Sequence, residues 1–291
     1  MKLKLAVFKG DKQDNSEAKT LVNKLNGLNG SPIATLIEYS DIIFTIINSS
    51  TEIRQISTSL KIEDIAEKYY VRDYHGYTHE RYAIARYLKN DKCTIYNTDT
   101  TNSEAISKLE QTIVFASNGL PVIDSVFFHP KNINKVDLPF GPPFIAKSIT
   151  GSNGNDNFLV DSRDELRSLV SATASKLIIQ RHVKNDGDFR VCIVGGKAIL
   201  VYKRSSNPKT HLNNVKQGAK RQIVKDEEVA ALAEKAAMTL GREICAVDII
   251  RDQDTKKPFL LECNFSGGMS LLGDGVDDEY FRRFAESIGS E

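Results

Sequence analysis

The chain has 291 residues, of which 41% are hydrophobic and 26% charged, which is an ordinary globular composition. Its 39 Lys and Arg side chains balance 38 Asp and Glu side chains, which disfavours a strongly basic nucleic-acid-binding protein. No apolar run approaches the roughly 20 residues of a membrane span, and four widely spaced cysteines favour a reducing, cytoplasmic setting.

The first hundred residues alternate between strand and helix patterns. Strands are predicted at 3–8, at 42–47 as a buried strand, at 69–71 and at 93–96. Helices are predicted at 16–25, ended by Asn26-Gly27, and at 78–88, begun by Thr78. This alternation indicates a small α/β layer.

The next segment, to about residue 180, has the same mixed pattern. A helix at 104–117 and a strand at 122–128 precede a proline-punctuated loop, and a strand at 144–147 then leads into a glycine-rich turn. Ser162 and Glu165 form a capping-box pattern that predicts a helix to about residue 175, followed by a strand at 177–180.

The remaining chain opens with a hairpin. Two strands, at 190–194 and 197–202, flank Gly195-Gly196, a strong signal for a two-residue turn. Residues 205–221 are polar and basic and read as a long loop. A helix begins at Asp226 and ends at Gly241, and a second hairpin and a last amphipathic helix follow.

The second hairpin carries a candidate magnesium site. Glu262 and Asn264 share one face of a strand, and a turn centred on Thr255 places Asp248 directly opposite Glu262. Two carboxylates and an amide oxygen suit Mg²⁺. The alternative is a plain polar face, since the opposite face (Val247, Ile249, Phe259, Leu261 and Cys263) is apolar.

Two further groups of residues suit phosphate chemistry. Lys147 ends an apolar strand before a turn containing Gly151, Ser152 and Gly154, where its ammonium could neutralise a phosphate; a surface lysine is the alternative. Asp188 and Arg190 share a face of the first hairpin and could contact a ribose hydroxyl and a phosphate, or form an ordinary surface ion pair.

The order of these features resembles the ATP-grasp superfamily, and within it the RimK-type glutamate and peptide ligases, from about residue 102 to 275. The resemblance implies a mixed α/β (α+β) ATP-grasp fold. An N-terminal pre-ATP-grasp α/β domain (1–101) would precede a central lid subdomain (102–181) and a C-terminal subdomain with the Mg site (182–291). The last two would sandwich the nucleotide.

The resemblance also implies residue roles. Lys108 would be a second phosphate-contacting lysine and Asn214 part of a phosphate-covering loop, while Gln180, Arg181, His182 and Val183 would border adenine. Arg190 and Arg204 would be catalytic. Strand alternation across the two-residue turn instead places Lys203 on the face of Arg190, so either Lys203 or Arg204 could contact phosphate, unless a bulge intervenes. The chain departs from the family pattern at Arg181, usually acidic, and at Ser266-Gly267-Gly268.

The implied activity is a carboxylate–amine ligase that uses ATP and one or two Mg²⁺ ions, with Mn²⁺ as a substitute, and proceeds through an acyl phosphate. The carboxylate would belong to a small molecule, a peptide or a protein tail, and the amine to an amino acid. The acceptor substrate could be contacted by a polar, aromatic stretch that contains Arg72, Tyr74, His75 and Arg81. Alternatively, this stretch is an exposed connection between a strand and a helix. Two alternatives remain: a kinase, and a non-catalytic ATP-binding module. No nucleic-acid or membrane partner is expected, and a homo-oligomer stays open.

Overall fold

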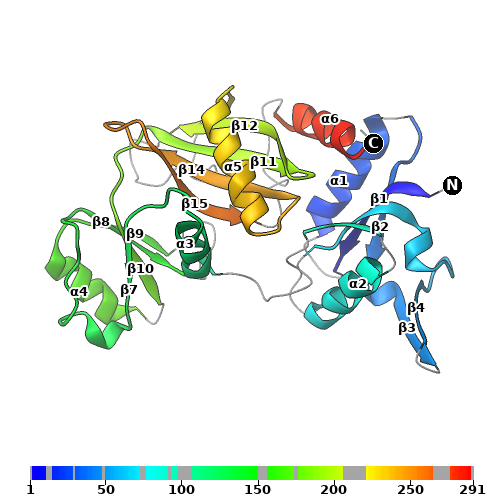
Figure 1. The fold of residues 1–291 in the computed structure, drawn as a ribbon, viewed down its shortest axis with the longest axis horizontal. Coiled ribbons are helices and arrows are strands. Elements are labelled where there is room, and N and C mark those ends of the chain that lie inside the picture. The colour runs from blue at the N-terminus through cyan, green and yellow to red at the C-terminus, as the bar shows by residue number, and fades with distance from the viewer. Residues whose placement is uncertain are drawn as a thin grey trace.

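Three larger sheets and one two-stranded hairpin make up the β-structure of the described part of the chain; Figure 1 shows their arrangement. A computed structural model of the chain describes residues 2–10, 15–28, 30–47, 50–72, 77–90, 93–97, 107–149, 156–173, 176–205, 221–264 and 276–289. One sheet is parallel and the other two are antiparallel, which confirms the expected mixed α/β class. Within the described ranges, no helix is long and apolar enough to cross a membrane.

The N-terminal sheet has the strand order β2-β1-β5-β6, with every pair parallel. Helices cover both faces of β1, whose residues 5–8 are fully buried, as is usual for parallel strands. Leu5 and Val7 pack toward helix α1, whereas Ala6 and Phe8 pack toward α2. The elements are β1 (Leu3–Lys9), α1 (Asn15–Leu28), β2 (Ala34–Glu38), β5 (Ala66–Tyr70), α2 (Thr78–Asn90) and β6 (Thr94–Tyr96).

The hairpin of β3 (Ile42–Ile47) and β4 (Ser50–Gln55) protrudes from this domain (Figure 1). Residues 42–47 form a strand as expected, but the prediction of burial is wrong: Ile46 is 72% exposed and Ile47 64% exposed. Only the base of the hairpin, at Ile42 and Ile53, joins the core. An apolar run does not reveal whether another layer will cover it. Short 3-10 turns flank the hairpin, η1 (Tyr39–Asp41) and η2 (Ile62–Asp64).

The second sheet is antiparallel, in the order β7-β10-β8-β9. Helix α4 packs through Leu166 and Val170 on the face that holds Phe144, Ala146 and Ile179, which leaves the alternate residues on the opposite face. Ser162 caps α4 by accepting a hydrogen bond from the Glu165 amide. The elements are β7 (Ser125–Phe127), η4 (Pro130–Asn132), β8 (Phe144–Ser148), β9 (Asn157–Val160), α4 (Arg163–Ala172) and β10 (Leu177–Arg181).

The third sheet is antiparallel, in the order β13-β12-β11-β14-β15. Helix α5 covers one face, and the Asp226 side chain caps it as predicted, accepting from the Val229 amide. The elements are β11 (Gly187–Val194), β12 (Lys197–Ser205), β13 (Arg221–Ile223), α5 (Glu227–Thr239), β14 (Cys245–Arg251) and β15 (Pro258–Asn264).

Helix α3 (Lys108–Ser117) lies beside β15 and links the second and third sheets (Figure 1). The prediction that it begins at residue 104 is wrong, because Ser107 is its N-cap and forms a complete capping box with Glu110. The amide of Lys108 donates to the carbonyl of Ile149, beyond β8, at 2.9 Å. The Gln111 side chain accepts from the amide of Cys263 in β15 at 2.7 Å.

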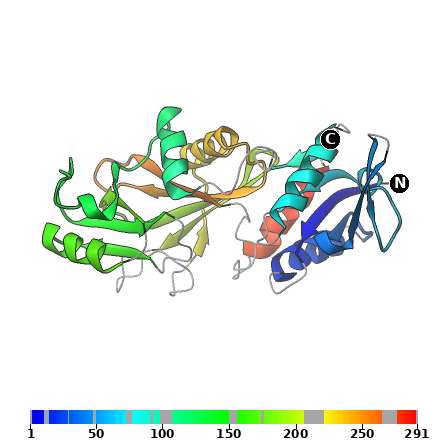
Figure 2. The ribbon, with the colours of Figure 1, turned by 90° about the horizontal axis from the view of Figure 1, so that it is seen from below.

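The last helix, α6 (Val276–Gly289), lies between the N-terminal and third sheets (Figure 2). Tyr280, Phe281 and Phe284 enter one apolar cluster with residues of β1, α1, β11 and β12. The contacts of α6 therefore combine both ends of the chain in one core. The domain boundaries expected at residues 101 and 181 stay a prediction.

Candidate functional site

A pocket lies between the second and third sheets. Lys147 and Gln180 reach it from the face of the second sheet that α4 leaves open, and Asp188 and Ile250 reach it from the third sheet. The residues that line it are Ile123, Ile145, Lys147, Asn157, Gln180, Arg181, His182, Val183, Asn185, Asp188, Ile250 and Leu261.

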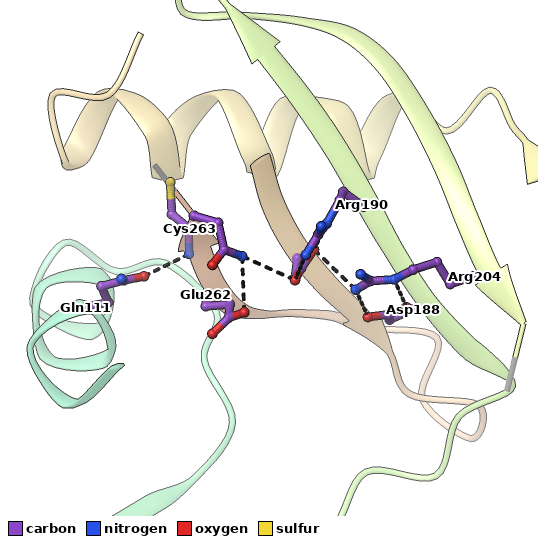
Figure 3. A network of polar contacts seen from close by, with 8 residues as sticks. Gln111, Asp188, Arg190, Arg204, Glu262 and Cys263 are labelled. Atoms are coloured by element: carbon purple, nitrogen blue, oxygen red, sulfur yellow. Dashed lines mark hydrogen bonds and ion pairs between the residues drawn. The ribbon is translucent and has the colours of Figure 1, made fainter. Parts of the chain in front are cut away.

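The three predicted metal ligands come together at one end of this cleft. Asp248 pairs directly with Glu262 across β14 and β15, as predicted. The Asn264 side-chain nitrogen lies 3.1 Å from Glu262 Oε1 and 3.4 Å from Asp248 Oδ2 (Figure 3). The amide nitrogen is thereby engaged by the two carboxylates.

A β-bulge in β15 places Asp248 opposite Glu262. Ile249 pairs with Leu260, but Asp248 pairs with Glu262, so Leu261 is the extra residue. Leu260 consequently faces the core under α5, whereas Phe259 and Leu261 pack with Ile250. The expectation that Phe259 and Leu261 share an apolar face with Val247 is therefore wrong, because the bulge shifts the alternation by one residue.

Two arginines hold the carboxylates of the third sheet. Arg190 donates two hydrogen bonds of 2.7 Å to Asp248, one to each carboxylate oxygen. Arg204 pairs in the same fork-like way with Asp188, with Nε 2.8 Å from Oδ1, and its Nη2 also lies 3.2 Å from Asp248 Oδ1 (Figure 3). Asp188, Arg204 and Asp248 are each buried.

Burial and ion pairing shift the pKa values of these carboxylates in opposite directions. Burial tends to raise the pKa of Asp248, but Arg190 and Arg204 outweigh it and lower the pKa to about 2. At Asp188, burial outweighs the Arg204 partner, so its pKa is raised. The pair of guanidiniums therefore secures the charged form of Asp248 in particular.

A second bulge decides between Lys203 and Arg204. Ile193 pairs with Ala198 but Cys192 pairs with Leu200, so Ile199 is an extra residue in β12. Arg204 then lies opposite Asp188 on the face of Arg190. The alternative assignment of Lys203 to that face is wrong: its Nζ donates to Asp186 at 2.6 Å and lies over the Phe189 ring.

The two predicted phosphate lysines lie near the predicted metal ligands. Burial, helped by the charge of Lys108 and opposed by Glu262 and Asp248, lowers the pKa of Lys147 to about 8. Lys108 Nζ lies 3.1 Å from Glu262 Oε2. Four cations (Lys108, Lys147, Arg190 and Arg204) thus face three carboxylates (Asp188, Asp248 and Glu262), an excess of positive charge that suits a polyanion.

The segment expected to border adenine forms the other end of the pocket. Gln180, Arg181, His182 and Val183 all line it. Arg181, however, points its guanidinium at Asp124, 3.0 Å away, and over the Phe259 ring. Sequence reasoning missed Asn157 and Asn185, which also line the pocket. Asn157 pairs with Lys147 across β8 and β9, and β9 itself was not predicted.

Several predicted residues cannot be placed. Gly151, Ser152, Gly154, Asn214 and the 266–268 turn lie outside the described residues, as do Tyr74 and His75. Arg72 and Arg81 are described, but they are buried in the N-terminal domain, where Arg72 pairs with Glu17 at 2.7 Å. The alternative of an exposed connection is therefore wrong for these two arginines.

The donor set fits a hard cation such as Mg²⁺. Asp248, Glu262 and Asn264 offer oxygen ligands from adjacent strands. At Asp248 the two arginines take three of about four lone-pair sites, and a metal would take the fourth in place of the Asn264 amide nitrogen. Within the described ranges, no group of three or more His, Cys, Asp or Glu side chains is arranged so that it could hold a metal ion on its own. A metal bound here would therefore depend on the amide and on non-protein oxygens for its remaining positions.

Comparison with known proteins places this cleft in context. Residues 114–278 match the family model described as the RimK-like ATP-grasp domain. The chain is similar to a probable alpha-L-glutamate ligase of Shewanella halifaxensis (28% identity; 67% of this chain, 44% of that one). It is also similar to probable alpha-L-glutamate ligase 1 of Pseudoalteromonas atlantica (28% identity; 66% of each chain). The matched segment thus spans less than two thirds of both relatives.

Solved structures match over nearly the full length. The ATP-grasp ligase PsnB, complexed with a minimal precursor, Mg and ADP, superposes with a TM-score of 0.72 at 15% identity, over 100% of this chain and 98% of that one. A RimK domain ATP-grasp protein from Sphaerobacter thermophilus superposes with a TM-score of 0.58 at 16% identity, over 97% and 98%. At such identities the likeness concerns the fold, including the N-terminal sheet.

Proposed function

The chain belongs to the RimK-like ATP-grasp family, and we propose that it is an ATP-dependent ligase that joins a carboxylate to an amine. The observation that carries the proposal is the convergence of Asp248, Glu262 and Asn264 beneath four cationic side chains, at the end of a pocket between two sheets. The name of the glutamate ligases and the Mg and ADP in the PsnB complex point the same way.

The nucleotide would lie along the cleft. The base would lie beside Gln180, Arg181, His182 and Val183, and the phosphates would extend toward Lys147 and Lys108. Asp248, Glu262 and Asn264 would hold Mg²⁺, which neutralises charge on phosphate oxygens when it is bound. Gly151, Ser152, Gly154 and Asn214 are proposed as further phosphate contacts, on sequence grounds alone.

The protein's share of catalysis is electrostatic. Phosphoryl transfer to a carboxylate gives an acyl phosphate, and attack by an amine then releases phosphate and forms the amide. Arg204 and Arg190 are fixed by carboxylates on adjacent strands, so their charges need not reorganise as negative charge develops. The low pKa of Asp248 keeps a negative charge available for a metal across the physiological pH range.

We propose that the carboxylate belongs to an amino acid or a peptide. The name of the glutamate ligases indicates an amino acid as one of the two substrates, without saying whether it supplies the carboxylate or the amine. PsnB, whose complexes include the precursor peptide PsnA2, favours a peptide, and it is matched over the whole chain rather than the ATP-grasp part. Peptides with Glu or Asp side chains are therefore tested beside free glutamate.

Product analysis tests the reaction class. Pooled carboxylates and amines are incubated with Mg-ATP and followed by mass spectrometry and phosphate release. A ligase forms an amide, and releases phosphate only when the acid and the amine are both present. Phosphorylation of an alcohol without amide formation would show a kinase, and nucleotide binding without any turnover would show a binding module.

A further inference from the structure

Gln180 is held by a short chain of hydrogen bonds that fixes which end of its side-chain amide faces the pocket. Gln180 and Ser125 are directly opposite on β10 and β7. The Gln180 Nε2 donates to Ser125 Oγ at 2.8 Å, and Ser125 Oγ in turn donates to the backbone carbonyl of Ile123 at 2.6 Å.

The direction of this chain follows from the chemistry of serine. A hydroxyl has a single hydrogen, and the carbonyl of Ile123 can only accept, so Ser125 uses its hydrogen there. Toward Gln180 the Ser125 oxygen can then only accept, which turns the NH₂ of Gln180 toward β7. The amide oxygen, Oε1, is directed away from it. Gln180 is 4% exposed, so water cannot easily reorient the amide.

The oxygen of Gln180 is the end that remains available to a ligand. Gln180 lines the pocket, and no described residue donates a hydrogen bond to its Oε1. An acceptor held in one orientation at a pocket wall can bind a ligand that presents a matching N–H group.

From this geometry we propose that Ser125 is a positioning residue that makes the pocket selective for adenine over guanine nucleotides. Adenine carries an amino group where guanine carries a carbonyl oxygen. The oriented Oε1 can accept a hydrogen bond from the adenine amino group. Opposite guanine, two acceptor oxygens would face each other without a hydrogen atom between them. This inference rests on the proposed nucleotide site and adds the residue that orients a contact with its base.

Calorimetric binding of Mg-ADP and Mg-GDP tests the proposal without any turnover. In Ser125→Ala the amide of Gln180 is free to turn over, so the ratio of the GDP to the ADP dissociation constant is expected to fall about tenfold from its wild-type value. Ser125→Thr keeps the hydroxyl and is expected to keep the ratio.

A double variant separates orientation from packing. In Ser125→Ala/Gln180→Glu, both oxygens of the introduced carboxylate accept hydrogen bonds. No orienting partner is then needed, and the preference for ADP is expected to return. An unchanged ratio in Ser125→Ala, or an equal loss of both nucleotides, would overturn the role of Ser125. Absence of Mg-ADP binding by the wild-type protein would instead overturn the proposed function, and this inference with it.

Discussion

Arg190 and Asp248 stand directly opposite each other on β11 and β14, joined by two hydrogen bonds of 2.7 Å. Asp248 is 4% exposed, so the pair is largely withdrawn from water. Removing one member of a buried pair leaves the other charge poorly compensated. The pair is therefore a stability element as well as part of the proposed active site.

Arg190→Met is expected to lower the free energy of unfolding by about 3 kcal/mol, measured by urea denaturation, because Asp248 keeps only its weaker contacts with Arg204 and Asn264. The double variant Arg190→Met/Asp248→Asn removes both charges and is expected to regain most of this loss. Equal stability of the single variant and the wild type would show that the pair contributes nothing.

Glu262→Gln is expected to leave the thermal midpoint within a few degrees of wild type but to reduce Mg-dependent ATP turnover at least about 100-fold, since the exchange keeps the volume and removes a ligand charge. Glu228→Gln, at a glutamate that is 61% exposed on α5, is the matched control and should keep full activity. Undiminished turnover in Glu262→Gln would refute the metal role.

The affinity for Mg-ADP is expected to fall as the pH rises through about 8, the pKa to which burial lowers Lys147. Bound phosphate favours the charged lysine, so above this pH each unit costs close to tenfold in affinity, and below it the affinity levels off. Calorimetry between pH 7 and 9.5 measures the slope.

The control for this pH dependence is Lys147→Arg, whose guanidinium stays charged throughout the range. Its affinity for Mg-ADP is expected to vary much less with pH than that of the wild type. The same slope in both proteins would assign the pH dependence to another group and remove Lys147 from the phosphate site.

Ser107→Ala is expected to lower the free energy of unfolding by about 1 kcal/mol, because Ser107 and Glu110 satisfy one another's backbone amides at the start of α3. Ser168→Ala, an exposed position inside α4, provides the comparison. A loss no larger than that of Ser168→Ala would show that the cap contributes little.

Sequence reasoning found the strands that carry the site and the pairing of Asp248 with Glu262, but not the bulge on which that pairing depends. Next to the turn Arg251 pairs with Pro258, and without the extra residue this register would place Leu261 opposite Asp248. It did not predict correctly which residues beside the two bulges share a face of the third sheet. The extra residues Ile199 and Leu261 each shift the alternation by one, and a bulge is settled by packing rather than by local propensity. Lys203 and Phe259 were misplaced for that reason.

Burial was harder to foresee than secondary structure. The run at 42–47 formed its strand, yet no second layer covers its described residues, which a one-dimensional pattern does not encode. The orientation of Gln180 is a similar case, because its partner Ser125 is 55 residues away in the sequence. Contacts of this kind appear only when distant strands are paired.

The docking of α6 also fastens the N-terminal sheet to the third sheet. Lys68 of β5 donates to the carbonyl of Ile288, and the amide of Ile244 donates to Asn97, so the first and third sheets are fastened together at two points. The second sheet joins the rest near Pro121, bonded to Leu260, and near Lys184, bonded to Gln253. The first and third sheets therefore share one apolar core as well as two hydrogen bonds, whereas the second sheet is connected to them by these crossings and by α3, whose Lys108 amide donates to the carbonyl of Ile149.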